Sequence, residues 1–289
     1  MASSPFPSGQ GYMIDKNTIE RMHAEIQGIM DSAGAAILDV YEKAESIEIT
    51  TKDDDSPLTL ADRRAHAIIA EGLRKMPEGF PVLSEESTLP DYEERRQWTT
   101  YWLVDPLDGT KEFINRNGEF TVNIALIHEG FPVAGWVYVP VRSQLYYGWS
   151  LDGDAAAFLA ENGASHAIAA RKLNPEAGVI VVASRRHGGE ALQPMLDKAE
   201  ARFAKLERKS IGSSLKICLV AEGKADWYPR LAPTSEWDTA AAHAVLLGAG
   251  GVMVDAEYKP LRYNTKESIL NPHFHAIADD GEVWKELVL

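Results

Sequence analysis

Apolar side chains recur with helical spacing near the start of the chain. Between residues 17 and 43 they return every three or four positions, which is the repeat of one face of an α-helix and predicts a long amphipathic helix. The acidic run Asp53-Asp54-Asp55 interrupts this pattern. Beyond it, Thr59 and Asp62 have the spacing of a capping box, so we expect a second helix that carries Asp62 in its first turn.

The middle of the chain has the pattern of β-strands. Apolar runs at residues 80–83 and 101–104 each lead directly into acidic residues. Further apolar runs are separated by turn residues, as in an antiparallel meander, and they cover residues 120–127, 133–139 and 144–149.

The alanine-rich segment 155–160 gives a mixed signal. Alanine favours helices, but the segment lies between Asp152-Gly153 and Asn162-Gly163, which are dipeptides typical of hairpin turns. We therefore interpret it as a strand.

After residue 175 the pattern changes to strands that alternate with helices. We expect a strand at 178–183, and helices at 189–201, 213–223 and 237–247. This alternation is typical of an α/β unit. The predicted parts are a mobile N-terminal tail over residues 1–14, an N-terminal α+β lobe over 15–165 and a C-terminal α/β lobe over 166–289.

The composition excludes several classes of protein. With 45% hydrophobic and 25% charged residues, the chain is typical of a globular protein. Its 43 acidic and 29 basic residues give a net charge of -14 without any basic block, so nucleic acid is an unfavourable partner. A single cysteine, Cys218, excludes an internal disulfide and suits a reducing compartment. Because no apolar run approaches the roughly 20 residues that span a bilayer, and no signal-peptide pattern is seen, we expect a cytoplasmic protein without integral membrane contact.

The segment Asp105–Thr110, with the sequence Asp-Pro-Leu-Asp-Gly-Thr, carries the clearest chemical signal. Its two carboxylates can converge around a turn, and the carbonyl oxygen of Leu107 can face the same side. Such a set of oxygen ligands favours Mg²⁺ or Mn²⁺ over zinc. If a helical turn starts after Gly109, its free N–H groups can bind an anion. The alternative is an ordinary tight turn, because Asp, Pro and Gly are common turn residues.

Acids from other parts of the chain favour the metal interpretation. Glu85 and Glu86 follow a neighbouring predicted strand, and Asp238 follows Trp237 at the start of a predicted helix. Ligand-binding residues often lie at such element ends. A cluster of carboxylates would be strongly unfavourable without bound cations.

These segments resemble a known superfamily. The runs 81–86 (PVLSEE), 101–113 (YWLVDPLDGTKEF) and 237–241 (WDTAA) resemble the metal motifs of the lithium-sensitive inositol monophosphatase superfamily. Residues 111–113, 115–123 and 211–216 are similar to its bacterial 3'(2'),5'-bisphosphate nucleotidases. The resemblance extends from about Asp31 to Phe274. It implies an α/β (α+β) fold, the layered αβαβα sandwich of the inositol monophosphatase and fructose-1,6-bisphosphatase type.

The resemblance also implies a set of metal ligands. Glu85, Asp105 and the Leu107 carbonyl would hold one Mg²⁺, while Asp105, Asp108 and Asp238 would hold a second. Two divalent ions about 3.5–4 Å apart can activate water and neutralise the leaving oxygen of a phosphate ester. Loaded with cations, an acidic site can bind a doubly phosphorylated anion. Li⁺ is implied as an inhibitor that competes for one Mg²⁺ position.

By the same resemblance, Asp62, Thr110 and Glu85 are the catalytic residues. Asp62 lies near a third, weaker metal in the family, and with Thr110 it would orient and deprotonate the attacking water. The amides of Gly109 and Thr110 would bind the scissile phosphate. Glu86 matches the second acid of the family's pair. Whether it binds a metal directly or contacts the residues that do is open. Which of the three aspartates at 53–55 faces the site is open.

Specificity is expected from the C-terminal lobe. Ser213 and Ser214 open a predicted helix with Lys216 in its first turn, so hydroxyls, amides and one cation can bind the other phosphate of a nucleotide. Arg230 is a second candidate cation. Ordinary N-capping is the alternative for the two serines, and the resemblance favours the phosphate. Residues 185–187 either reach the ribose or base or form a solvated loop.

Other conspicuous side chains are interpreted as structural. The histidines lack metal-ligand spacing, and the tryptophans fit core or lobe-packing positions. Cys218 is expected to be a small buried group without reactivity. The side chains in question are His66, His243, His275, Trp98, Trp102, Trp136 and Trp149.

The sequence therefore predicts a Mg²⁺-dependent phosphatase that removes the 3'-phosphate of adenosine 3',5'-bisphosphate (PAP) to give AMP and phosphate. The sulfated relative of that nucleotide, PAPS, is a further candidate substrate. One alternative is an inositol monophosphatase or sugar bisphosphatase of the same superfamily. The other is a non-catalytic metal- or nucleotide-binding protein. Oligomeric state and contact with the inner face of the membrane are left open by the sequence.

Overall fold

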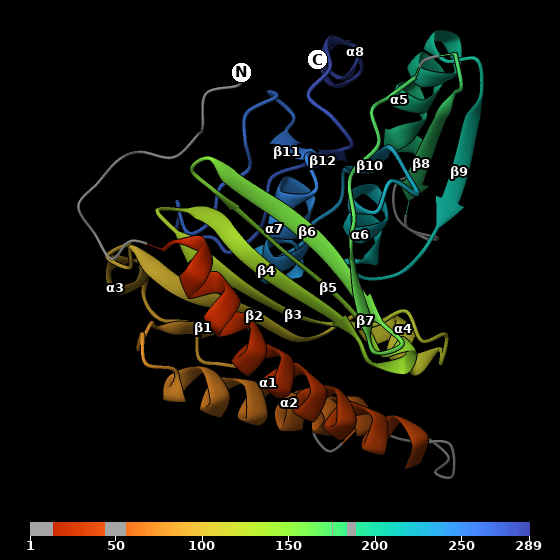
Figure 1. Ribbon diagram of the computed structural model, residues 1–289. Helices are drawn as coiled ribbons and strands as arrows, with labels where there is room; N and C mark the ends of the chain where they lie inside the picture. Colours follow the sequence, from red (N-terminus) through yellow and green to blue (C-terminus); the bar gives the residue numbers. More distant parts are fainter. Residues whose placement is uncertain (1–13, 44–55, 175, 184–188) are drawn as a thin grey trace.

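A computed structural model describes residues 14–43, 56–174, 176–183 and 189–289 of the chain. Its helices and sheets alternate in five layers (Figure 1): a helix pair, a first sheet, central helices, a second sheet and an outer helix pair. Three hydrophobic clusters fill the spaces between these layers. The predicted layered sandwich is confirmed.

Helices α1 (Lys16–Lys43) and α2 (Pro57–Lys75) form the first layer. The predicted helix over 17–43 is thus confirmed. Its buried side chains recur at helical spacing because one face of α1 packs on the first sheet, and they include Ile19, Met22, Ile26, Met30 and Ile37.

The predicted start of the second helix was wrong. Ser56 is the N-cap, and its hydroxyl accepts the N–H of Thr59 at 3.3 Å, while Pro57 occupies the first helical position. Proline favours that position because its fixed φ suits a helix and it has no N–H to satisfy. Asp62 therefore lies in the second turn of α2, and Thr59 and Asp62 do not form the expected capping box.

The first sheet contains seven strands in sequence order, and β1 and β2 are its only parallel pair among the described residues. The predicted meander is confirmed, including the alanine-rich strand β6, because the turn dipeptides on both sides outweigh helix propensity. The strands are β1 (Val82–Ser84), β2 (Thr100–Asp108), β3 (Thr121–His128), β4 (Phe131–Val139), β5 (Gln144–Leu151), β6 (Asp154–Glu161) and β7 (Ala164–Ala167).

Central helices α6 (Leu215–Ala221) and α7 (Ala240–Gly248) lie between the two sheets (Figure 1). The backbone of α7 approaches β4 so closely that a Cβ at Gly135 would overlap the carbonyl of Ala241. Glycine at position 135 therefore permits α7, with the turn that precedes it, to pack directly on the first sheet.

Both central helices differ from their predicted bounds. The helix expected over 213–223 begins at Leu215, because Ser213 has a left-handed φ of 47° that a helix does not allow. The helix expected over 237–247 is divided into a 3₁₀ turn, η3 (Glu236–Asp238), and α7. Thr239 separates the two with a φ of -120°.

The second sheet has the strand order β11-β12-β10-β8-β9. Strands β10, β8 and β9 are parallel, and β12 is antiparallel to its neighbours. Helices α5 (Gly189–Arg202) and α8 (Glu282–Val288) cover its outer face. The strands are β8 (Val179–Ala183), β9 (Leu206–Ser210), β10 (Trp227–Arg230), β11 (Val252–Asp255) and β12 (Phe274–Ile277). The remaining helical segments are α3 (Tyr92–Arg95), α4 (Thr110–Ile114) and η2 (Pro140–Arg142).

Some predictions fall outside the described residues: the tail up to residue 13, Asp53-Asp54-Asp55 and residues 185–187. The division into lobes near residue 165 stays a prediction. In the described part of the chain, no helix has the length and apolar character needed to cross a membrane.

Candidate functional site

Three acidic residues from separate elements meet at one point. Glu85 directly follows β1, Asp105 lies within β2, and Asp238 ends η3, yet each offers a carboxylate oxygen within 4.8 Å of the others. We call these residues the acidic cluster. The parallel pairing of β1 and β2 brings the first two together, and the N–H of Glu85 donates to the carbonyl of Val104 at 3.1 Å. The predicted convergence of acids from distant segments is therefore present in the fold.

The electrostatics of the acidic cluster fit a bound cation. Burial, together with the neighbouring acids, raises the pKa of Asp105 well above its usual range. Burial and nearby Asp108 raise the pKa of Asp238 to about 8, and burial also raises that of Glu85. A divalent ion would remove this mutual repulsion, and the oxygen-only donors suit Mg²⁺ or Mn²⁺.

A bulge in the pairing of β2 with β3 orients Asp105 and Asp108. Residues three apart on a regular strand point to opposite faces. Here Asp105 pairs with Asn123 and Asp108 with Thr121, and the register shifts between these pairs. Such a shift lets both acids serve the same site. The N–H of Leu107 donates to Asp105 Oδ1 at 3.0 Å, and the role of the Leu107 carbonyl as a ligand stays a prediction.

The turn after β2 has the backbone conformation that the phosphate prediction needs. Gly109 has a φ of 99° and caps α4, which begins at Thr110. A Cβ at Gly109 would lie 3.2 Å from the Cα of Phe120, so both the left-handed φ and the packing favour glycine. The first N–H groups of α4 therefore start next to Asp108.

Asp62 lies in the electric field of the same acids. It is partly buried on α2, and burial, followed by the charges of Glu86 and Glu85, raises its pKa to about 8. Glu86 itself is exposed. The structure thus brings Asp62 near the acidic cluster, while its joint role with Thr110 stays a prediction.

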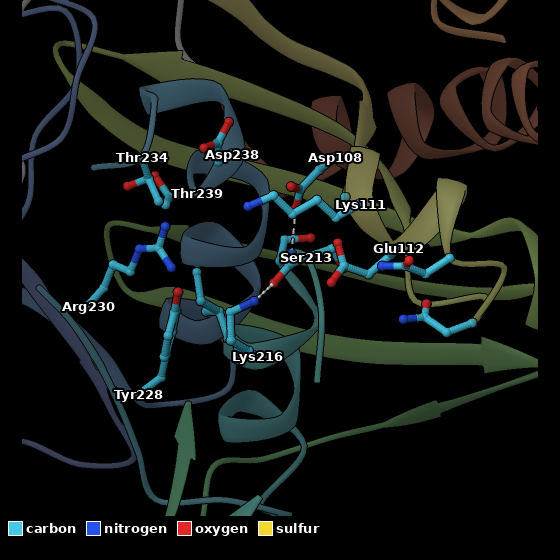
Figure 2. A pocket seen from close by; sticks show the side chains of 15 residues that line it. Asp108, Lys111, Glu112, Ser213, Lys216, Tyr228, Arg230, Thr234, Asp238 and Thr239 are labelled. Carbon is cyan, nitrogen blue, oxygen red and sulfur yellow. Dashed lines mark hydrogen bonds between the residues drawn. The ribbon is translucent and has the colours of Figure 1, made fainter. Parts of the chain in front are cut away.

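A cavity of about 190 Å³ adjoins the acids. Asp108 and Asp238 lie along one side of it, and Lys216 and Arg230 approach from the other (Figure 2). Lys111 and Glu112 also line it, and Lys111 lies beside Asp108 (Figure 2). The predicted residues thus divide into two acids, Asp108 and Asp238, on one side and two cations, Lys216 and Arg230, on the other.

Lys216 is deeply placed for a charged residue. It is 6% exposed, and its ammonium donates to the carbonyls of Ser213 at 2.6 Å and Ile211 at 3.4 Å. Burial lowers its pKa to about 8, against the opposing effect of Asp108. The Arg230 guanidinium donates to two backbone carbonyls, those of residues 232 and 233.

The two predicted serines differ. Both serines line the cavity, and the Ser213 hydroxyl accepts the N–H of Leu215 at 3.4 Å. Ser214 is 3% exposed, and its hydroxyl donates to Asn123 Oδ1 at 3.0 Å and pairs with the hydroxyl of Thr121 at 2.9 Å. Within the described residues Ser214 makes no side-chain capping bond. The Ser214 hydroxyl already donates its proton to Asn123, so Ser213 is the serine whose hydroxyl can still donate to a ligand.

Several further cavity residues were not assigned a role from the sequence. Lys111, Glu112, Asn117 and Thr239 lie in the runs that resemble the superfamily, and that position was the signal that could have identified them. Thr234 lies in no such run. The unassigned lining residues include Lys111, Glu112, Asn117, Tyr228, Thr234 and Thr239.

The packing of the residues interpreted as structural supports that interpretation. His243 Nδ1 lies 2.9 Å from the hydroxyl of Tyr263, and His275 Nδ1 accepts the indole N–H of Trp227 at 3.2 Å. Burial lowers the pKa of His243 to about 3 and that of His275 to about 4. His66 Nδ1 lies 2.9 Å from the Ser84 hydroxyl. The other packed side chains are Trp98, Trp102, Trp136, Trp149 and Cys218, and burial raises the pKa of the Cys218 thiol.

A layered sandwich with acids gathered beside a cavity that also contains cations suits a phosphatase, and comparison with known proteins agrees. The chain belongs to the inositol monophosphatase family, which matches residues 19–286.

Within this family the chain is similar to proteins of one name. The 3'(2'),5'-bisphosphate nucleotidase CysQ of Salmonella typhimurium is 50% identical over 243 residues, which are 84% of this chain and 94% of the relative. The protein of that name from Escherichia coli K12 is 48% identical over the same shares.

Solved structures agree on the fold. The crystal structure of CysQ from Bacteroides thetaiotaomicron, described as a bacterial member of the inositol monophosphatase family, has 44% identity and a TM-score of 0.80, and covers 91% of this chain and 98% of its own. An inositol monophosphatase from Zymomonas mobilis has 23% identity and a TM-score of 0.73, with coverage of 93% and 96%, and supports the fold alone.

Proposed function

We propose that this protein is a Mg²⁺-dependent 3'(2'),5'-bisphosphate nucleotidase that converts adenosine 3',5'-bisphosphate to AMP and phosphate. The observation that carries the proposal is the two-sided cavity, in which Asp108 and Asp238 lie opposite Lys216 and Arg230. A substrate with two phosphates can place the scissile one at the acids and the other at the cations. Relatives with 48–50% identity bear the name of this activity.

The proposed metal ligands are all oxygen donors. Glu85, Asp105 and the Leu107 carbonyl would hold one Mg²⁺, and Asp105, Asp108 and Asp238 a second, with a third, weaker position near Asp62. When bound, such ions supply Lewis acidity that activates water and neutralises the leaving oxygen.

The protein's own groups then have distinct tasks. Asp62 would accept the proton of the attacking water. Burial and the neighbouring acids raise the pKa of this carboxyl in the metal-free protein, and bound cations would lower it and so favour the ionised form that acts as a base. The Thr110 hydroxyl orients that water. The amides of Gly109 and Thr110 bind the scissile phosphate at the start of α4.

The second phosphate is assigned to the cationic side of the cavity. Lys216 and Arg230 provide charge, and Ser213 provides a hydroxyl. Both cations are already held by backbone carbonyls, which fixes their direction before the ligand arrives. Ser214 contributes through its position in the same loop. PAPS is a further proposed substrate, Li⁺ a proposed inhibitor at one Mg²⁺ position, and the cytoplasm the proposed location.

A substrate panel tests the proposal. Initial rates with Mg²⁺ are compared for adenosine 3',5'-bisphosphate, inositol 1-phosphate and fructose 1,6-bisphosphate, each with and without Li⁺. We expect the bisphosphate nucleotide to be hydrolysed fastest and Li⁺ to inhibit. Faster hydrolysis of inositol 1-phosphate would identify that compound, and not the nucleotide, as the substrate. Nucleotide binding without any hydrolysis would favour the non-catalytic alternative.

A further inference from the structure

The proposed metal acid Asp108 is held by the loop that the proposal gives to the second phosphate. This loop, residues 211–214, donates the N–H of Ser214 to Asp108 Oδ2 at 2.5 Å. Its shape is fixed on both sides: the N–H of Gly212 donates to the Glu119 carboxylate at 2.7 Å, and the carbonyl of Ser213 accepts the Lys216 ammonium at 2.6 Å. A movement of the loop would therefore move a partner of Asp108.

Asn123 anchors this loop to the first sheet. Its Oδ1 accepts the Ser214 hydroxyl, and it is 1% exposed. On β3 it pairs with Asp105, while Thr121, two residues earlier, pairs with Asp108 and also contacts Ser214. Side chains two residues apart on a strand share a face. Thr121 and Asn123 thus form a buried platform between the acids and the loop.

The side chain of Asn123 also affects Asp108. Within the part of the chain that the structure describes, Nδ2 is buried and forms no hydrogen bond of normal geometry. The Asn123 side chain nevertheless lies near enough to Asp108 to lower the pKa of that carboxyl, which burial raises. A buried amide N–H without a hydrogen-bond partner is costly. The oxygen of Asn123 therefore holds the loop, and the Ser214 N–H of that loop continues the connection to Asp108.

We propose that Asn123 is a positioning residue that couples the 211–214 loop to Asp108, so that phosphate bound at the loop and metal bound at Asp108 strengthen each other. The inference rests on the proposed function, because it takes the loop as the second-phosphate site and Asp108 as a metal ligand. Such coupling is reciprocal: the factor by which phosphate tightens metal binding equals the factor by which metal tightens phosphate binding.

Calorimetric titration with Mg²⁺ tests the coupling without relying on turnover. The wild type and Asn123→Leu, which keeps the volume but removes both polar atoms, are titrated alone, with adenosine and with AMP. AMP carries the second phosphate and adenosine does not. We expect Asn123→Leu to bind Mg²⁺ about tenfold more weakly, as for loss of a group that orients a metal ligand. In the wild type AMP should tighten Mg²⁺ binding more than adenosine does, and this difference should disappear in the variant.

Two further variants make the result decisive. Ser214→Ala removes the hydroxyl but keeps the N–H to Asp108, so it should show the same loss in smaller measure, and it decides the matter if Asn123→Leu does not fold. His275→Leu breaks a buried hydrogen bond in the second sheet and should leave Mg²⁺ affinity unchanged.

Wild-type Mg²⁺ affinity and an unchanged AMP effect in Asn123→Leu and Ser214→Ala would overturn the coupling, even if the bisphosphate is hydrolysed. A wild type that shows the coupling but does not hydrolyse the bisphosphate would contradict the proposed function instead.

Discussion

The acidic and cationic sides of the cavity are built in opposite ways. The acids come from two neighbouring strands and a 3₁₀ turn, whereas the main cation comes from a short helix whose preceding loop it binds. Burial penalises both: it raises the pKa of Asp105 and lowers that of Lys216 to about 8. A ligand of the opposite charge relieves each penalty, metal ions on one side and phosphate on the other. The two sides are therefore prepared for different ligands, and Asp108 links them, because it lies on the acidic side and accepts the N–H of Ser214 from the loop that binds Lys216.

The largest effect is expected at Asp108. Asp108→Asn removes the anionic donor while keeping its size, so turnover of the bisphosphate should fall by at least about 10³-fold, since a bound metal contributes several kcal/mol. Because a buried carboxyl with a raised pKa is lost, thermal stability without metal should be unchanged or higher. Steady-state kinetics and thermal melting measure the two quantities. Asp152→Asn, at an exposed turn, serves as the control, and undiminished turnover in Asp108→Asn would eliminate the metal assignment.

A change at Lys216 should distinguish the binding of the second phosphate from that of the scissile phosphate. Lys216→Ala removes one charge-assisted contact to the second phosphate, so KM for the bisphosphate should rise by about 10- to 100-fold. KM for a monophosphate substrate whose only phosphate is the scissile one should change little, because that phosphate binds at the acids, whereas the 5'-phosphate of AMP belongs to the second-phosphate site. Kinetics on both substrates provide the measurement, and Lys216→Met, which keeps the hydrocarbon stem, controls for lost packing. Equal losses on both substrates would place Lys216 outside the second-phosphate site.

A smaller effect is expected from crowding the 211–214 loop. A Cβ at Gly212 would overlap the side chain of Glu112, so Gly212→Ala should shift the loop or that carboxylate. We expect KM for the bisphosphate to rise by about tenfold or less, in line with an overpacking cost of about 1 kcal/mol. Gly28→Ala is the matched control: its Cβ meets open space on α1, so it should stabilise the helix slightly and leave KM unchanged. A Gly212→Ala enzyme with wild-type KM would show that the loop position does not matter.

The smallest effect is a pH dependence of the metal-free protein. The folded pKa values of Asp62 and Asp238 are about 8, above the ordinary 3.8, so the folded state binds protons that the unfolded state releases. Their contribution to stability is therefore lost as pH rises toward 8. His243 and His275 change stability only below about pH 6.5, and Lys216 acts in the opposite direction only above about pH 8.

For the protein kept metal-free by a chelator, the melting temperature at pH 8 should thus be several degrees lower than at pH 6.5. Saturating Mg²⁺ should make this difference smaller. Thermal melting at both pH values measures it. A melting temperature of the metal-free protein that rises from pH 6.5 to pH 8 would show that ionisation of Asp62 and Asp238 does not destabilise the folded state.

Local pattern was sufficient for much of the fold. Helical spacing predicted α1, and turn dipeptides identified β6 despite its alanines. Ser56 and Pro57 were overlooked because Thr59 and Asp62 also have a capping pattern, and only the three-dimensional start of α2 decides between them. The segment after residue 211 was expected to be helical too early, because the sequence does not reveal the left-handed φ of Ser213.

The site was predictable where motifs mark it. Glu85, Asp105 and Asp238 were identified as a set because each follows a recognisable element and matches a known motif. The contact of Ser214 with Asn123 was not predictable, because it joins residues 91 positions apart and depends on how the loop packs against β3. Thr234 was missed for the same reason, since no motif or periodicity marks a cavity wall.

Anomalous diffraction from crystals grown with Mn²⁺ in place of Mg²⁺ locates the bound metal. We expect an anomalous peak within ligand distance of Asp105, shared with carboxylate oxygens of Glu85 or Asp238. A protein that hydrolyses its substrate in Mn²⁺ yet shows no peak among these three carboxylates would contradict the metal assignment.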